Sequence, residues 1–197
     1  MTQRLAAAAI IRKRAPGPPY DAAHPVQVAR LALALFDQLR PIHGLGNAER
    51  RYLRYAALLH DIGILSGAKG HHKRSQRIIL RAPGLPLKGL ERRLAAQVAR
   101  YHRKAMPSTR HALYAALDRP DRRRVRVLAG LLRVADGLDV GHRRAIKSLS
   151  CRVTGDQIVV TCAAAGDAET ERARALEKGR LMEKAFRRRL AIVLCRR

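Results

Sequence analysis

The feature that most constrains the fold of this chain is a recurrence of apolar residues at helical spacing along most of its length. Val28, Leu31, Leu35 and Leu39 stand three or four residues apart, which places them on one face of an amphipathic helix. Trp is absent and aromatic residues make up only 4% of the sequence, so Ala and Leu must fill the core. Both residues favour helix over sheet, and we therefore predict a mostly α-helical fold.

Proline and glycine mark the ends of the expected helices. Pro41 and Gly44 end the first helix, and Pro83 and Pro107 break the chain further on. A loop that contains several glycines covers residues 63–70. The helices that we predict cover residues 24–40, 48–60, 71–82, 90–102, 109–118 and 121–139.

The pattern changes toward the C-terminus. Residues 149–153 and 158–162 flank the sequence Thr-Gly-Asp-Gln, which predicts a β-hairpin with Gly-Asp at its turn. A charged helix is expected over 168–187, and the short apolar tail at 190–194 could add a strand. The predicted organisation is a helical domain over 1–145, which includes an N-terminal extension over 1–20, and a hairpin–helix appendage over 146–197.

The formal net charge is +26, and most of the basic residues are Arg. A solvated Arg-rich surface would account for this charge, but so would a polyanionic partner such as a nucleotide, polyphosphate, nucleic acid or an acidic membrane surface. No nucleic-acid-binding motif is present and stacking aromatic residues are few. The charge therefore indicates that a binding partner would be an anion, but it does not identify which anion.

The cysteines and the N-terminal region indicate the cellular compartment of the protein. The three cysteines, Cys151, Cys162 and Cys195, form no CxxC pair, and we expect small buried hydrophobic residues in a reducing compartment. The apolar run at 5–11 is too short to span a bilayer, and Arg-Lys-Arg follows it without an obvious cleavage site. These observations predict a cytoplasmic protein with no membrane span.

Histidines and carboxylates recur in order at the ends of the expected helices. The series consists of His24, His60, Asp61, His71, His72, His102 and Asp136. Taken singly, each His is more often an ordinary core or surface residue, and Asp136 on its apolar helical face could pair with an arginine. An ordered series on consecutive helices is far rarer by chance, and a buried carboxylate needs a metal ion or another cation. Imidazole and carboxylate ligands together suit Zn²⁺, Fe or Mn²⁺.

The sequence at this point resembles a known superfamily. His24, His60-Asp61 and Asp136 resemble the H…HD…D signature of HD-superfamily metal-dependent phosphohydrolases. The segments HPVQVARLALALFDQL, AALLHDIG, HHKRS, VARYHRK, LLRVADGLDVGHRR, CRVTGDQIVV and EKGRLMEKAFRRRL look like the C-terminal HD region of the exopolyphosphatase/guanosine-pentaphosphate phosphohydrolase (Ppx/GppA) family. The resemblance implies an HD-domain helical bundle. The phosphatase domains of that family have no counterpart here, so we expect a stand-alone HD protein.

The resemblance also implies a ligand set and a cofactor. By analogy with dinuclear HD enzymes, the first metal is held by His24, His60, Asp61 and Asp136. Asp61 bridges to a second metal held by His71, or by His72 in its place, and by His102. The implied cofactor is one or two divalent transition metal ions, drawn from Mn, Fe, Zn, Co and Ni, with Mg also compatible.

The implied activity is hydrolysis of a phosphoester or phosphoanhydride bond in a phosphorylated small molecule such as a nucleotide, or in polyphosphate. We predict Asp61, His60, Lys73 and Arg103 as catalytic residues. The predicted substrate-binding residues are Lys73, Arg74, Arg103, Lys104, Asp139, His142 and Arg143. Asp139 and His142 could instead orient a ligand or pair with an arginine. The alternative function is a non-catalytic polyphosphate-binding or regulatory module, and a homodimer is compatible with either.

Overall fold

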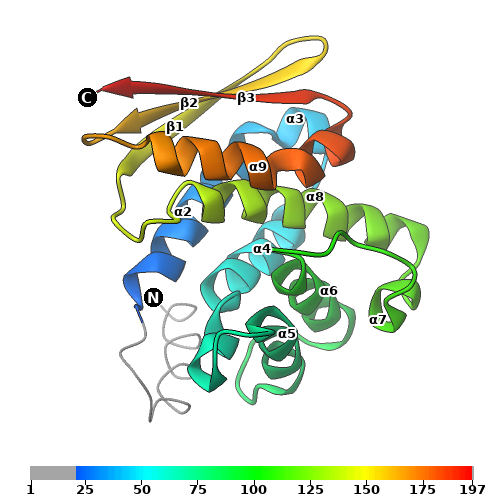
Figure 1. The fold of residues 1–197 in the computed structure, drawn as a ribbon. Coiled ribbons are helices and arrows are strands. Elements are labelled where there is room, and N and C mark those ends of the chain that lie inside the picture. The colour runs from blue at the N-terminus through cyan, green and yellow to red at the C-terminus, as the bar shows by residue number, and fades with distance from the viewer. Residues whose placement is uncertain (1–20, 197) are drawn as a thin grey trace.

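The computed structural model describes residues 21–196, and the N-terminal extension expected over 1–20 lies outside this range (Figure 1). The fold is mostly helical with a small sheet near the C-terminus, as predicted. Among the described residues, no helix combines the length and hydrophobicity needed to cross a membrane. In chain order the elements are α2 (Ala23–Gln38), α3 (Arg40–His43), α4 (Asn47–Leu59), η1 (Ile62–Ser66), α5 (His71–Arg81), α6 (Gly89–Arg100), α7 (Ala112–Ala115), α8 (Arg119–Gly137), β1 (Ile146–Val153), β2 (Gln157–Ala164), α9 (Glu169–Phe186) and β3 (Arg189–Arg196).

Four local features differ from the predicted elements. The helix expected over 109–118 is a single turn, and the glycine-containing loop at 63–70 holds a 3₁₀ turn. The first helix leaves helical geometry at Leu39, and a further short turn follows because Pro41 is tolerated at the start of a helix. Helix α8 begins earlier than predicted, since the Asp118 carboxylate caps it by accepting the backbone N–H of Asp121 at 2.7 Å.

The core is built largely from leucine and alanine, as the composition predicts. Helices α2, α4, α6 and α8 pack against one another, and α5 packs on α6. Their inward faces are fully buried; the largest side chains among them include Tyr55, Tyr101, Phe36, Leu31 and Leu35. Figure 1 shows α9 lying between this helical body and the sheet.

The sheet has the strand order β1-β2-β3. β1 and β2 form the predicted antiparallel hairpin, and the C-terminal tail adds β3 parallel to β2. The parallel pairing follows from α9, because a helix that connects two neighbouring strands returns the chain to run in the same direction. The sheet and α9 therefore form one supporting unit.

The expectation that all three cysteines are buried is wrong for one of them. Cys162 is buried and Cys151 is half-buried, but Cys195 is exposed. Side chains alternate between the two faces of a strand, and Cys195 stands opposite Ala163, on the face away from the core. All three thiols are free.

Glycines allow α9 to lie very close to α8. A Cβ atom on Gly137 would lie 2.5 Å from Ala175 Cα, and one on Gly130 would lie 2.9 Å from Met182 Cα. The two glycines are two helical turns apart and share one face of α8. The division into a helical domain and an appendage stays a prediction, but the appendage helix is packed onto the helical domain at backbone distance.

We expect Gly137→Ala to destabilise the protein by about 1–3 kcal/mol, because the added methyl group overlaps the backbone of α9 and the two helices must separate. Urea unfolding followed by circular dichroism measures the change. Gly155→Ala is the matched control, because a Cβ there meets nothing within 4 Å. Equal stability of the two variants would contradict the close packing of α8 and α9.

Candidate metal centre

Several helix ends meet at one point below α9, and each brings one histidine or carboxylate. His24 lies in the first turn of α2, His60 follows α4, and His71 begins α5. His102 follows α6, and Asp136 lies in the last turn of α8. These five side chains are buried. The side chain of Asp61, directly after His60, is only 17% exposed.

A glycine brings α5 up to this point. A Cβ on Gly63 would lie 2.3 Å from the carbonyl oxygen of His71, so only glycine fits here. The backbone N–H of Gly63 also donates to Ser75 Oγ at 3.0 Å. The turn that follows Asp61 is thereby held against the start of α5, next to His71.

The Asp61 carboxylate lies between three imidazoles. Its Oδ1 atom lies 3.0 Å from His71 Nε2 and 3.3 Å from His102 Nε2. Its Oδ2 atom lies 3.6 Å from His60 Nε2. The two oxygens of this carboxylate therefore face different histidines, which is the arrangement that a bridging ligand requires.

The Asp136 carboxylate faces a second pair of imidazoles. Its Oδ1 atom lies 3.5 Å from His24 Nε2 and 3.7 Å from His60 Nε2. Its Oδ2 atom forms an ion pair with the ammonium group of Lys178 on α9. His60 thus lies between both carboxylates.

Three of the histidines turn Nδ1 toward a backbone carbonyl. The contacts are His60 Nδ1 to Ala57 O (2.7 Å), His71 Nδ1 to Ala68 O (2.9 Å) and His102 Nδ1 to Ala99 O (2.7 Å). A carbonyl oxygen can only accept a hydrogen bond, so Nδ1 of each ring carries a proton and Nε2 is the atom left to face the carboxylates. Hydrogen bonds of this kind orient the histidine ligands of metal ions.

His24 is held by a carboxylate instead. Its Nδ1 atom lies 2.8 Å from Oδ2 of Asp139, which is fully buried and also accepts the backbone N–H of Arg144 at 2.8 Å. Burial would lower the pKa of His24, but Asp136 and Asp139 raise it to about 9. His24 must therefore release a proton when it binds a metal ion.

The residues present fit a divalent metal ion. Nε2 of His60 and Oδ1 of Asp61 are buried and have no hydrogen-bond partner among the described residues. Two triplets hold their ligand atoms within 4.8 Å of one another: His24, His60 and Asp136, and His60, Asp61 and His102. Lone pairs of imidazole and carboxylate repel one another unless a cation lies between them, and this nitrogen–oxygen donor set suits Mn, Fe and Zn.

The electrostatics keep His60, Asp61 and Asp136 in the protonation states that a ligand needs. Burial lowers the pKa of His60 to about 4, so its ring is neutral near pH 7. Burial would raise the pKa of both carboxyl groups. The neighbouring histidines instead hold the pKa of Asp61 well below its usual range. Lys178 and His24 do the same for the pKa of Asp136.

The ligand cluster opens into a pocket of about 730 Å³. Arg103 and Lys104 line it, and Arg103 Nη1 lies 3.4 Å from His71 Nε2. His142 also lines the pocket, and its ring stacks on that of His24 with centroids 3.8 Å apart. These three predicted substrate-binding residues are therefore at the site, whereas buried Asp139 orients His24 and does not line the pocket.

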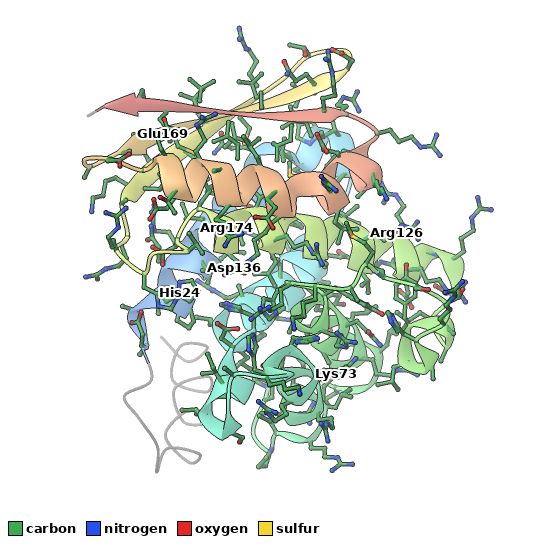
Figure 2. The ribbon with its side chains drawn as sticks, viewed as in Figure 1. His24, Lys73, Arg126, Asp136, Glu169 and Arg174 are labelled. Carbon is green, nitrogen blue, oxygen red and sulfur yellow. The ribbon has the colours of Figure 1, made fainter. Side chains whose placement is uncertain are left out.

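Adjacent residues of α5 point in different directions, so the candidate residues His71, His72 and Lys73 do not all face the cluster. His71 faces Asp61, whereas His72 is buried elsewhere, and neither His72 nor Lys73 lines the pocket. Burial, followed by Arg100, lowers the pKa of His72 to about 3. Lys73 is exposed, and Figure 2 shows it well apart from His24 and Asp136. Because each residue turns about 100° around a helix, one of two adjacent histidines points into the cluster and the other does not.

Two predicted substrate-binding arginines are engaged elsewhere. Arg74 donates to the carbonyl oxygens of Gly63 (3.0 Å) and Gly67, so it fastens the turn before α5. Arg143 is exposed and pairs with Glu171 at 3.3 Å. Neither side chain lines the pocket.

Helix α9 contributes a part of the site that was not predicted from the sequence. Arg174 lies on the α9 side of the pocket, as Figure 2 shows, and Arg133 lines it from α8. The remaining α9 residues in the pocket wall are Glu177, Lys178 and Arg180. Arg133 stands one helical turn before Asp136, a spacing that could have identified it. No spacing links α9 to the metal ligands.

The chain matches a known protein family over most of its length. A family model described as Ppx/GppA phosphatase, domain III, matches residues 19–184, which covers most of the chain. The matched range includes all of the candidate ligands and most of α9. No curated protein matches the chain.

We expect Asp139→Ala to destabilise the protein by about 1–3 kcal/mol, because it leaves buried donors of His24 and Arg144 without an acceptor. The affinity for Mn²⁺ should also fall, by about 10–100-fold, because His24 loses the group that orients it. Thermal unfolding and calorimetric titration measure the two effects. Asp156→Ala, at an exposed ion pair, is the control and should change neither.

Proposed function

Since this chain belongs to the Ppx/GppA phosphatase family, matched through that family's domain III, we propose that it is a metal-dependent phosphohydrolase of the HD type. The proposed centre consists of His24, His60, Asp61, His71, His102 and Asp136. The proposed substrate is a phosphoester or phosphoanhydride in a nucleotide or a polyphosphate-like anion.

One observation carries this proposal. The Nδ1 atoms of His60, His71 and His102 are all engaged with backbone carbonyls, so each ring turns its Nε2 atom toward the Asp61 carboxylate. Three imidazole nitrogens that converge on one largely buried carboxylate form a donor set that suits a divalent metal ion.

The residues divide into two groups around Asp61. His24, His60 and Asp136 would hold one metal ion, and His71 and His102 would hold a second, with Asp61 between the two. When bound, a divalent metal ion supplies Lewis acidity that polarises a phosphoryl oxygen and lowers the pKa of water from about 15.7 toward 7.

The cations of the pocket would bind the substrate. Arg103 and Lys104 follow His102 directly, so their charges lie beside the ligand cluster. Arg133 donates to the carbonyl oxygens of Tyr101 (2.7 Å) and Lys104 (2.8 Å) and thereby holds this turn in place. Fixed guanidinium and ammonium groups neutralise the charge that develops on phosphoryl oxygens during hydrolysis.

A second candidate function is a non-catalytic polyanion-binding module. The observation that favours it is that Arg174, Lys178 and Arg180 line the pocket from α9 and outnumber the acidic residue that α9 also contributes, Glu177, in a chain whose net charge is +26. Turnover separates the two candidates, because a binding module would retain inorganic polyphosphate or a nucleotide without hydrolysing it.

Asp61→Ala should abolish hydrolysis of phosphorylated substrates and strongly reduce bound metal, because it removes the carboxylate that both ligand groups share. Elemental analysis and a phosphate-release assay with nucleotides and polyphosphate measure these effects. Asp37→Ala, at a surface ion pair, is the control. An Asp61→Ala protein with full activity and full metal content would refute the assignment.

Arg103→Ala should lower kcat/KM by about 10²-fold, because it removes a charge beside the reacting phosphoryl group. Lys73→Ala should leave kcat/KM unchanged, because Lys73 is exposed outside the pocket. Steady-state kinetics on both variants checks this difference. The reverse pattern would show that α5, and not the turn after α6, binds the substrate.

A further inference from the structure

Helix α9 places a positively charged side chain at the candidate metal centre. Lys178 on α9 forms an ion pair with Oδ2 of Asp136, and the Lys178 side chain lines the same pocket as the ligands. We propose that Lys178 acts as a resident counter-ion, which neutralises Asp136 while the His24 position lacks a metal and opposes metal binding there. This inference rests on the metal centre proposed above.

The two oxygens of Asp136 have different partners. Oδ1 faces the imidazoles of His24 and His60, and Oδ2 faces the ammonium group of Lys178. A metal ion between the two imidazoles would therefore reach Asp136 through Oδ1 alone. The ammonium group would remain on the other oxygen of the same carboxylate, where its charge repels the ion.

The position of Lys178 is set by the packing of its helix. Gly137, next to Asp136, lets α9 approach to the point where a Cβ would lie 2.5 Å from Ala175 Cα. Ala175 precedes Lys178 by about one helical turn, so the two residues lie on adjoining parts of the same face. The backbone of α9 cannot carry the ammonium group away from Asp136 unless the two helices separate.

The two metal positions therefore differ in charge. Among the described residues, the oxygens of Asp61 face imidazoles, whereas Asp136 shares its charge with Lys178. Arg103 lines the same pocket, and its Nη1 atom contacts His71. We infer that a metal ion binds first at the Asp61 position and more weakly at the His24 position, and that Lys178 contributes to this order.

Substitution of Lys178 should have opposite effects on stability and on metal affinity. Lys178→Met removes the counter-ion of a buried carboxylate, so the metal-free protein should unfold at a lower temperature. The same change should tighten the weaker step of Mn²⁺ binding about tenfold, because a repelling charge is gone. Lys178→Arg, which keeps the charge, should bind Mn²⁺ like the wild-type protein.

The experiment is calorimetric titration with Mn²⁺ alone, together with thermal unfolding of the metal-free proteins. Lys184→Met, on the same helix but exposed and outside the pocket, is the control and should change neither quantity. Lys178→Gln serves where Lys178→Met folds poorly, because its amide still donates to Asp136 without the charge.

The outcomes separate this inference from the proposed function. Tighter Mn²⁺ binding by the two neutral variants supports the role of Lys178. Equal or weaker binding than in the wild-type protein overturns that role and leaves the metal centre in place, because Lys178 would then be only a structural partner of Asp136. A wild-type protein that binds no Mn²⁺ overturns the metal centre and the role of Lys178 together.

Discussion

The burial of two ionised carboxylates inside a helical protein is the constraint on which the rest of this structure depends. Asp61 and Asp136 lie where helix ends meet, and their charge must be offset by cations or by polarised donors. Imidazoles surround Asp61, while Asp136 is shared between imidazoles and Lys178. The hydrogen bonds of the histidines, the close approach of α5 and the packing of α9 all maintain this cluster.

The C-terminal unit has a structural part in the site. The hairpin and β3 hold α9, and glycines on α8 bring α9 to backbone distance from the helical body. The pocket consequently has a wall of ligands from α2 to α8 and a wall of charged side chains from α9. The match to domain III of the Ppx/GppA phosphatases includes most of α9, in agreement with a single unit.

Residue identity and order predicted most of the fold, but not which neighbours face the cluster. The apolar periodicity located the main helices, and Thr-Gly-Asp-Gln located the hairpin. Spacing could not choose between His71 and His72, because adjacent residues on a helix differ by rotation alone. Lys73 flanks a ligand in sequence and yet points into solvent.

The sequence by itself determined the helical class, the order of the histidines and carboxylates, and their positions near helix ends, since these depend on local propensity and periodicity. Only the tertiary structure decided that α9 closes the pocket and that Lys178 reaches Asp136. The reason is physical: contacts between segments 42 residues apart depend on how helices pack, and a surface arginine or lysine looks the same in sequence as one that lines a pocket.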